Sequence, residues 1–397
     1  MTTAVIVDVV RTPSGKGKPG GQLSGVHPAD LLSRVLRGLL DRNDLDAALV
    51  DDVIGGCVGQ AGEQAVNITR NAVLGAGFPE SVPATTVDRQ CGSSQQSAHF
   101  AAQGVIAGAY DVVIACGVES MSRVPMGSPV AGKDPFGPAV AARYPEGLVG
   151  QGVSAEIIAG RWKLDRAALD EFSARSHARA AATAAAGGFD REILPVTVTG
   201  EDGTERTVST DETVRANTTV EGLSGLKPSF YDERLAERFP EIAWRITPGN
   251  SSPLTDGASA ALIMSEEKAN ALGLTPRARF HSFAVTGSDP LLMLTGVVPA
   301  TQKILARSGL ALDDIDAYEV NEAFAPVPLL WQHELNADPE RLNPRGGAIA
   351  LGHPLGASGT RLLGTLLGQL EASGGRYGLQ TMCEGGGMAN ATIIERL

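Results

Sequence analysis

The stretch that decides the fold is ATTVDRQCGSSQQSAHFAAQGVIAGAYDVVIA, residues 84–115. Two short, apolar and mostly β-branched runs, 84–87 and 111–115, flank a segment of small residues, 94–107, that is long enough for a helix. Short continuous apolar runs are typical of buried strands, and a helix between two of them is typical of a βαβ unit. The stretch therefore predicts an α/β fold with a largely buried sheet.

The same alternation extends in both directions and then repeats. Upstream, we expect strands at 5–10 and 52–56 and a helix at 29–40. The second half has the same order of elements: a helix from about 299, a strand at 316–320, a helix at about 358–370 and a strand at 378–382. This order predicts two copies of one βα arrangement, related by a pseudo-twofold axis.

Polar or reactive residues mark the strand ends of both copies. Cys57 and Cys91 lie 34 positions apart in the first half, and Asn321 and His353 lie 32 apart in the second. Cys116 and Cys383 follow as the next pair of landmarks. We expect the repeat to bring equivalent strand ends together.

Residues 122–247 differ from both halves. Proline and glycine are dense at 125–152, an alanine-rich helix is expected at 166–186, and core-like sequence resumes at 251–264. Long excursions from a compact domain usually bind a ligand or mediate assembly. We therefore interpret this segment as an insertion that covers a site.

The composition excludes several classes of protein. With 45 acidic and 33 basic residues the formal charge is −12, which opposes binding to nucleic acid. No apolar stretch approaches the ~20 residues of a membrane span, and the N-terminus lacks the features of a signal peptide. The four cysteines are far apart without a C-x-x-C pair, which favours reduced thiols and a cytoplasmic protein over zinc or disulfides. Residues 15–20 match G-x-G-x-x-G, but no helix follows directly, so we do not expect a dinucleotide site.

Cys91 lies where a predicted strand gives way to a helix. Free N–H groups and the helix dipole at such a turn favour a thiolate and would lower the pKa of the thiol. Gly92 allows the backbone to turn sharply. The alternative is a small buried residue at a helix start, and the turn alone does not decide between the two.

Two further segments carry candidate chemistry. His353 lies in NPRGGAIALGHPLGASG (343–359), a stiff loop in which a neutral imidazole could take a proton from Cys91. Cys383 is expected directly after a strand and before three glycines, whose N–H groups could face an anionic oxygen. The alternatives are a structural histidine and a glycine-rich turn with a buried cysteine.

With these residues in view, the chain resembles the thiolase family over essentially its full length. The segments that carry the resemblance are Arg89-Gln-Cys91-Gly-Ser, Asn250-Ser-Ser-Pro-Leu-Thr-Asp-Gly-Ala, Asn321-Glu-Ala-Phe-Ala325, Gly346-Gly-Ala-Ile-Ala-Leu-Gly-His353-Pro and Cys383-Glu-Gly-Gly-Gly387.

The resemblance implies a thiolase fold, in which two duplicated βαβαβαββ halves form a five-layered αβαβα core with an inserted loop domain. Residues 1–121, completed by 248–273, would form the N-terminal half. Residues 122–247 would be the inserted domain, with coenzyme A binding and oligomer contacts, and 274–397 the C-terminal half.

The resemblance also implies the roles of the site residues. Cys91 would be the nucleophile, His353 its base and Cys383 the acid/base for the second substrate. One oxyanion hole would consist of His353 and a water held by Asn321, and a second of the N–H groups of Cys91 and Gly385. Implied coenzyme A contacts are Arg215, Leu226, Phe230, Ser252 and Phe324.

Coenzyme A would be a substrate, with no permanently bound cofactor and no metal. The implied assembly is a homodimer or homotetramer, without nucleic-acid or membrane partners.

Some positions depart from the commoner family pattern. Gln151 replaces a Met, Ser94 a Gly and Pro253 a Gly or Gln, and Glu384 stands where a small or apolar residue is usual. A carboxylate at 384 would raise the pKa of Cys383.

The segments around Cys91 and Cys383 look most like actinobacterial degradative thiolases of fatty-acid or steroid β-oxidation. We therefore expect thiolytic cleavage of a bulky or branched 3-ketoacyl-CoA. The alternatives are an acetoacetyl-CoA-forming acetyl-CoA acetyltransferase and a non-catalytic acyl-CoA-binding protein on the same fold.

Overall fold

The computed structural model describes residues 2–200 and 203–397, in which ten strands form one hydrogen-bonded sheet. The order is β10-β11-β12-β9-β1-β8-β5-β3-β4, and β2 pairs with β8. These strands are β1 (Ala4–Arg11), β2 (Gly15–Lys16), β3 (Asp52–Gly56), β4 (Ala84–Val87), β5 (Val112–Ser120), β8 (Thr255–Ser265), β9 (Ala278–Gly287), β10 (Ala317–Val320), β11 (Tyr377–Glu384) and β12 (Met388–Arg396).

The four predicted helices of the core agree with their predicted positions to within a few residues. In the first of them Pro28 occupies the first turn and His27 Nδ1 accepts from Ala29 N. The core helices are α1 (Pro28–Arg42), α2 (Ile68–Gly75), α3 (Ser93–Ile106), α9 (Glu266–Ala271), α10 (Val297–Ser308), α11 (Pro326–Leu335), α12 (Ala348–Leu351) and α13 (Ser358–Ser373).

The strand pairing shows the duplication. In the first half β3 runs parallel to β5, which is antiparallel to β8, which is antiparallel to β1. In the second half β10, β11, β12 and β9 pair in the same way. The two halves join where β1 meets β9, at the pairs Val5–Arg279 and Ile6–Ala278. The predicted repeat is therefore present as two equivalent sets of strands.

The register corrects one of the predicted landmarks. Gly56, the last residue of β3, pairs with Gly117, and Val320, the last residue of β10, pairs with Thr381. Two residues further along each neighbouring strand stand Glu119 and Cys383. Glu119, and not Cys116, is thus the counterpart of Cys383. Cys383 also lies within β11 instead of after it.

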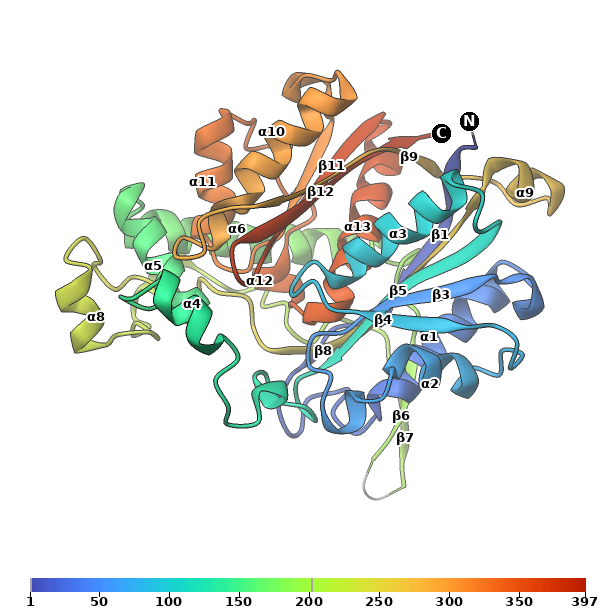
Figure 1. Cartoon of the computed structure of the whole chain (residues 1–397), viewed down its shortest axis with the longest axis horizontal. Coiled ribbons are helices and arrows are strands. Elements are labelled where there is room, and N and C mark those ends of the chain that lie inside the picture. The colour runs from blue at the N-terminus through green and yellow to red at the C-terminus, as the bar shows by residue number, and fades with distance from the viewer. Residues whose placement is uncertain (1, 201–202) are drawn as a thin grey trace.

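The helices divide the core into five layers, which Figure 1 shows from α10 and α11 at the upper left to α1 and α2 at the lower right. α1 and α2 cover the outer face of the first-half strands, and α10 and α11 cover that of the second. α3 and α13 pack against each other between the two sets of strands. The architecture is αβαβα, as the fold class predicted.

Small residues allow the two central helices to approach closely. A Cβ on Gly359 of α13 would overlap the backbone of Gln95 in α3. Gly356, just before α13, has its carbonyl oxygen against Gly117 and Gly56. Side chains at these positions would force the halves apart, so the glycines let the starts of both central helices meet.

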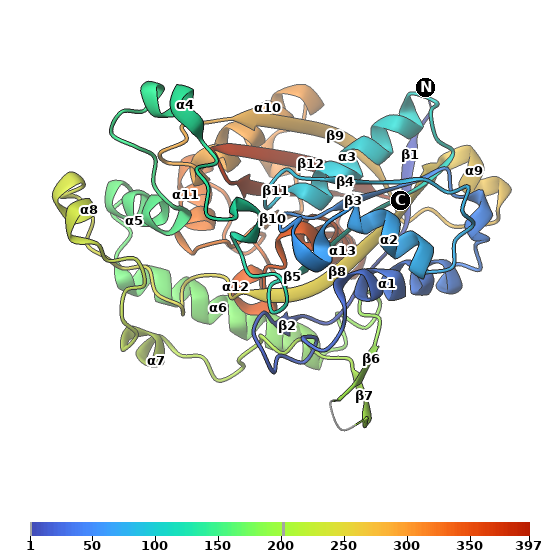
Figure 2. The same cartoon turned by 60° about the horizontal axis from the view of Figure 1, so that its bottom comes forward.

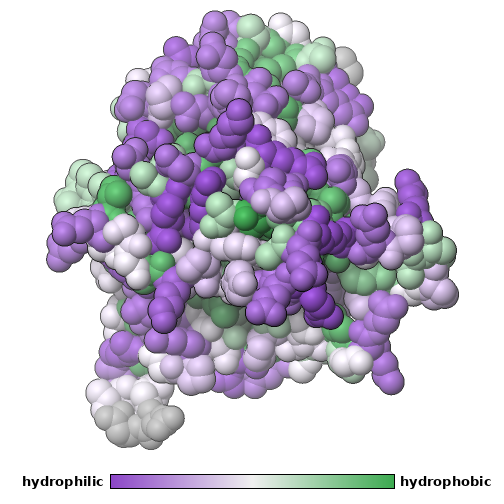
Figure 3. Space-filling model, turned by 90° about the vertical axis from the view of Figure 1, so that its left-hand side faces the viewer, coloured by the Kyte–Doolittle hydropathy of each residue, from purple (hydrophilic) through white to green (hydrophobic). Residues whose placement is uncertain are grey.

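The segment between the halves extends along the left-hand and lower sides of the core in Figure 2. Its elements are α4 (Gly137–Arg143), α5 (Gln151–Arg161), α6 (Arg166–Ala185), the hairpin of β6 (Val196–Thr199) and β7 (Glu205–Val208), α7 (Val220–Ser224) and α8 (Glu233–Arg238). The face that contains α5 and α8 is mostly hydrophilic, with scattered apolar residues (Figure 3). No helix in the described part of the chain has both the length and the apolarity needed to cross a membrane.

Candidate active site

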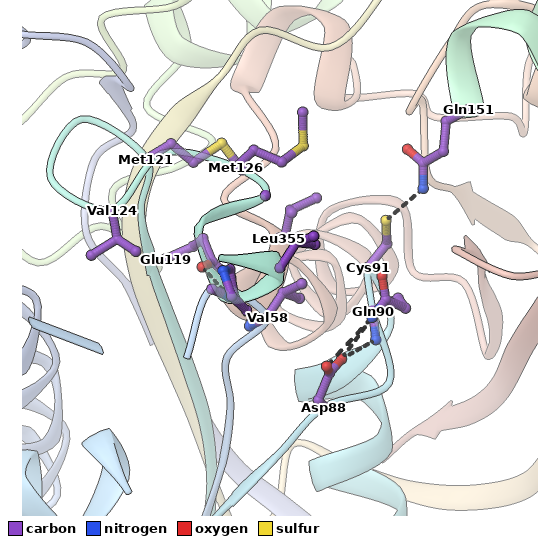
Figure 4. Close-up of a pocket in the computed structure, with 14 residues that line it drawn as sticks. Val58, Asp88, Gln90, Cys91, Glu119, Met121, Val124, Met126, Gln151 and Leu355 are labelled. Carbon is purple, nitrogen blue, oxygen red and sulfur yellow. Dashed lines mark hydrogen bonds between the residues drawn. The ribbon is translucent and has the colours of Figure 1, made fainter. Parts of the chain in front are cut away.

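A cavity of about 280 Å³ opens where the first-half strands end and the inserted segment begins. Figure 4 shows the Cys91 thiol at its wall, pointing toward Gln151 from α5. The cavity is lined by Val58, Gly59, Asp88, Gln90, Cys91, Glu119, Met121, Val124, Met126, Gly127, Pro129, Val130, Gln151 and Leu355.

The turn that carries Cys91 is tightly constrained. Gln90 has a φ of 49°, and its backbone N–H donates to Asp88 Oδ1 at 2.7 Å. Gly92 is the N-cap of α3, and Cys91 itself is only 3% exposed. Gln151 Nε2 donates to Cys91 Sγ at 4.0 Å. The thiol is therefore held at the cavity wall and contacts a polar amide.

Burial, and not the helix start, dominates the ionisation of Cys91. Desolvation raises the pKa of this thiol to about 12, while the Gln151 hydrogen bond opposes the rise and Glu384 adds to it. The expectation of a lowered pKa is therefore wrong, because the thiolate would lose more hydration than the helix N-terminus restores. In the resting protein Cys91 is a thiol and needs a base.

His353 is a buried neutral imidazole in the loop between α12 and α13. Its Nδ1 lies 2.6 Å from Ser358 Oγ, and Ser358 Oγ donates to Pro354 O at 2.9 Å. Since that hydroxyl has only one proton, Nδ1 must donate to it, which leaves Nε2 without a proton and therefore an acceptor. Burial, followed by the charge of Arg361, lowers the pKa of His353 to about 3. The ring is thus uncharged at neutral pH, with Nε2 available as a base.

Asn321 follows β10 and reaches the same imidazole. Its Nδ2 lies 3.3 Å from His353 Nε2, while its buried Oδ1 has no hydrogen-bond partner among the described residues. A buried amide oxygen without a partner is costly, and a water or ligand atom would satisfy it. Asn321 and His353 are therefore adjacent, and Asn321 Oδ1 remains available to accept a hydrogen bond.

Cys383 and Gly385 approach the Cys91 turn from the β11–β12 hairpin. Cys383 is fully buried, and desolvation, then Cys91, then Glu384 raise its pKa well above that of a free thiol. Gly385 packs against Gln90, since a Cβ there would lie 2.8 Å from Gln90 Oε1. The two cysteines are thus close enough to influence each other's charge.

Glu119 is a residue of the site that the sequence interpretation missed. Its buried carboxylate accepts from the backbone N–H groups of Val58, Gly59 and Gly356 at 2.9–3.0 Å, and from Gln64 Nε2. It thereby ties the loop after β3 to the loop that follows His353. Aligning the repeat on strand register instead of on cysteines would have identified it as the counterpart of Cys383.

Four of the five predicted coenzyme A residues lie near the inserted segment and the Asn250 loop. Phe230 packs on Gly152, next to Gln151, and its ring meets that of Phe324 edge-on at 6.0 Å. Ser252 Oγ donates to Ala323 O at 3.1 Å. Leu226 packs over Gly249. Arg215 is exposed, and its backbone N–H donates to His177 Nδ1; no described contact joins it to the other four.

Comparison with known proteins agrees with this architecture. Family models described as "Thiolase, N-terminal domain" and "Thiolase, C-terminal domain" match residues 4–267 and 274–396. The steroid 3-ketoacyl-CoA thiolase FadA6 of Mycobacterium tuberculosis is 49% identical and covers 100% of this chain and 95% of its own. The 3-ketoacyl-CoA thiolase of Pseudoalteromonas translucida is 45% identical over the full length of both chains. The crystal structure of the Bacillus anthracis acetyl-CoA acetyltransferase superposes with a TM-score of 0.89 at 36% identity, covering 100% and 99% of the two chains.

Proposed function

This chain belongs to the thiolase family and is an acyltransferase, and we propose from that premise that it cleaves a 3-ketoacyl-CoA with coenzyme A. The products are acetyl-CoA, or a related acyl-CoA, and a shortened acyl-CoA. The observation that carries the proposal is a buried thiol, Cys91, at a cavity wall, whose charge acts on a second buried thiol, Cys383. His353, whose Nε2 carries no proton, supplies the base.

In the first half-reaction the acyl group moves to Cys91. His353 Nε2 takes the Cys91 proton, and Sγ attacks the 3-keto carbon. The keto oxygen becomes negative and is stabilised by the N–H groups of Cys91 and Gly385. The bond between C2 and C3 then breaks, and the departing enolate takes a proton from the Cys383 thiol. A thioester on Cys91 remains.

In the second half-reaction coenzyme A resolves the thioester. The Cys383 thiolate accepts the coenzyme A proton, and the new thiolate attacks the Cys91 carbonyl. The shortened acyl-CoA leaves as Cys91 regains its proton from His353. The enolate oxygen of the first step belongs at His353 and at a water held by the free Oδ1 of Asn321.

Coenzyme A enters between the inserted segment and the core. Phe230, Phe324 and Leu226 form apolar walls, Ser252 lies near the pantetheine amide, and Arg215 lies near the adenine end. In this proposal residues 122–247 form the inserted domain, while 1–121 with 248–273 and 274–397 form the halves. Coenzyme A is a substrate, and no cofactor is permanently bound.

The assembly is a homodimer or homotetramer, as in the family resemblance. The cytoplasm suits a chain with four free cysteines, since reducing compartments keep thiols unpaired.

The acyl group is bulky or branched and derives from fatty-acid or steroid breakdown. The cavity wall next to Cys91 is largely apolar, with Val58, Met121, Val124, Met126 and Leu355 facing it. The relative with 49% identity has a name that specifies steroid 3-ketoacyl-CoA. Both observations favour a large apolar acyl group over acetoacetyl-CoA.

Two measurements test the proposal. Intact-protein mass spectrometry after mixing with acetyl-CoA should show an acetyl adduct that disappears in Cys91→Ala, while circular dichroism shows that this variant remains folded. A panel of 3-ketoacyl-CoAs should then give a higher kcat/KM for bulky chains than for acetoacetyl-CoA. Absence of the adduct would refute the mechanism, and a strong preference for acetoacetyl-CoA would refute the substrate class.

A further inference from the structure

Glu384 is a buried carboxyl group that the reaction outlined above does not use. It is the last residue of β11, next to Cys383, and it is fully shielded from solvent. Neither of its oxygens has a hydrogen-bond partner among the described residues. Burying a carboxylate without hydrogen bonds is expensive, so its presence at this position calls for a function.

The position of Glu384 is fixed by the turn that carries the nucleophile. A Cβ at Gly92 would overlap Glu384 Oε1, so a glycine directly after Cys91 makes room for the carboxyl group. Glu384 in the hairpin and Gly92 in the turn are therefore in direct contact. This contact places Glu384 beside the backbone that positions Cys91.

The charged neighbours of Glu384 come from the same turn. Arg89 Nη1 lies 4.0 Å from Glu384 Oε2, and Asp88 adds an opposing negative charge. Glu384 acts in turn on the Cys91 and Cys383 thiols. One partly exposed cation, Arg89, therefore faces four groups that can become negative: the carboxyl groups of Asp88 and Glu384 and the thiols of Cys91 and Cys383. Ionisation of Glu384 thus affects both reactive sulfurs.

We propose that Glu384 is a positioning residue whose charge state controls how readily Cys91 and Cys383 ionise. The inference rests on the proposed function, in which both thiols transfer protons. A protonated Glu384 is neutral and leaves proton transfer from Cys91 to His353 unopposed. An ionised Glu384 places a negative charge beside both sulfurs and opposes either thiolate.

The ionisation of Glu384 falls in an accessible pH range. Desolvation raises the pKa of Glu384 to about 8, and Arg89 only partly offsets this. The carboxyl group is therefore mostly protonated at pH 6.5 and mostly ionised at pH 9. The reactivity of Cys91 should rise less steeply with pH than that of an isolated buried thiol.

The test measures iodoacetamide alkylation of Cys91, by peptide mass spectrometry, from pH 6.5 to 9.5 in the wild type and in Glu384→Gln. Glutamine has nearly the same shape but cannot ionise. At pH 6.5 the two rates should agree within about twofold, and at pH 9 the variant should react at least threefold faster. Equal rates at every pH, or a variant that is slower throughout, would overturn the proposal.

Controls separate charge from packing. Glu395→Gln removes a carboxylate that is paired with Arg279 and Arg376 at the far end of β12, and should leave the alkylation profile unchanged. If Glu384→Gln does not fold, Arg89→Gln provides the test. Loss of the cation should raise the pKa of Glu384. The pH above which Cys91 alkylation rises less steeply in the wild type should then move to higher pH. An unmoved profile in Arg89→Gln would contradict the proposal. Alkylation requires no turnover, so this result is independent of whether the acetyl adduct forms.

Discussion

At the scale of single residues, the most informative contact is the one between His353 and Ser358. The Ser358 hydroxyl donates to Pro354 O, and this fixes which imidazole nitrogen carries the proton. Sequence indicated His353 from its unusual loop, but could not indicate which of its nitrogens is basic. That depends on a hydroxyl five residues later, at the first position of α13.

Ser358→Ala should lower kcat by about 10-fold or more, because the imidazole loses the partner that holds its basic nitrogen toward the site. The KM for coenzyme A should change little. Steady-state kinetics measure both constants.

Ser97→Ala is the matched control for Ser358→Ala. Ser97 is an equally buried hydroxyl that donates only to Ser93 O within α3. Its removal should leave kcat within about twofold of the wild type. If both variants lose activity equally, the tautomer argument does not hold.

At the scale of elements, Glu119 joins two loops that come from different halves. Its carboxylate accepts hydrogen bonds from three backbone N–H groups and one side-chain amide. A buried donor that loses its acceptor destabilises the fold by about 1–3 kcal/mol. Glu119→Ala should therefore lower the unfolding free energy by about 3 kcal/mol or more. It should also reduce kcat, since Gly356 follows His353 by three residues. Urea unfolding and kinetics measure the two effects.

Glu63→Ala is the comparison for Glu119→Ala. Glu63 is partly exposed and pairs with Arg123, so its loss should cost no more than about 1 kcal/mol. A Glu119→Ala protein as stable as Glu63→Ala would show that the carboxylate does not hold the loops together.

The elements also show how far the sequence could be interpreted. The strands at 52–56 and 84–87 were predicted to the residue, because their short length and β-branched residues favour strands over helices. The equivalence of positions in the two repeats was not predicted correctly, since Cys116 was matched to Cys383 by residue type. Only hydrogen-bonded pairing shows that Glu119 occupies that place. Likewise, the sequence pointed to a helix N-terminus at Cys91 but not to the burial that outweighs it.

At the scale of the whole molecule, buried groups with displaced pKa values shape the dependence of stability on pH. Burial raises the pKa of Glu319 and Glu384 to about 8, so these two carboxyl groups hold more protons in the folded than in the unfolded state between about pH 4.5 and 8. Burial lowers the pKa of His353 and His99 to about 3, so these two imidazoles hold more protons in the unfolded state between about pH 3 and 6.5. Both imbalances destabilise the fold, one as pH rises and the other as pH falls.

The unfolding free energy should therefore be greatest between about pH 5 and 6.5. Above that range it should fall by up to about 1.4 kcal/mol per pH unit for each carboxyl group that releases its proton only in the unfolded state. Denaturant unfolding at pH 4.5, 6 and 8.5 measures the curve. Glu384→Gln should flatten its alkaline side, and stability that still increases from pH 6 to 8.5 would contradict this assignment.

The glycine contacts between the central helices have a consequence for thermal inactivation. Gly359 allows α13 to pack against Gln95, and Gly356 lies against Gly117. Both glycines are within a few residues of His353, and Gln95 is within a few residues of Cys91. The catalytic loops are thus anchored by the innermost contacts of the core, and not by a peripheral segment that could melt first. Heating should leave the enzyme fully active until the core itself unfolds. The temperature of half-inactivation and the calorimetric Tm should then coincide.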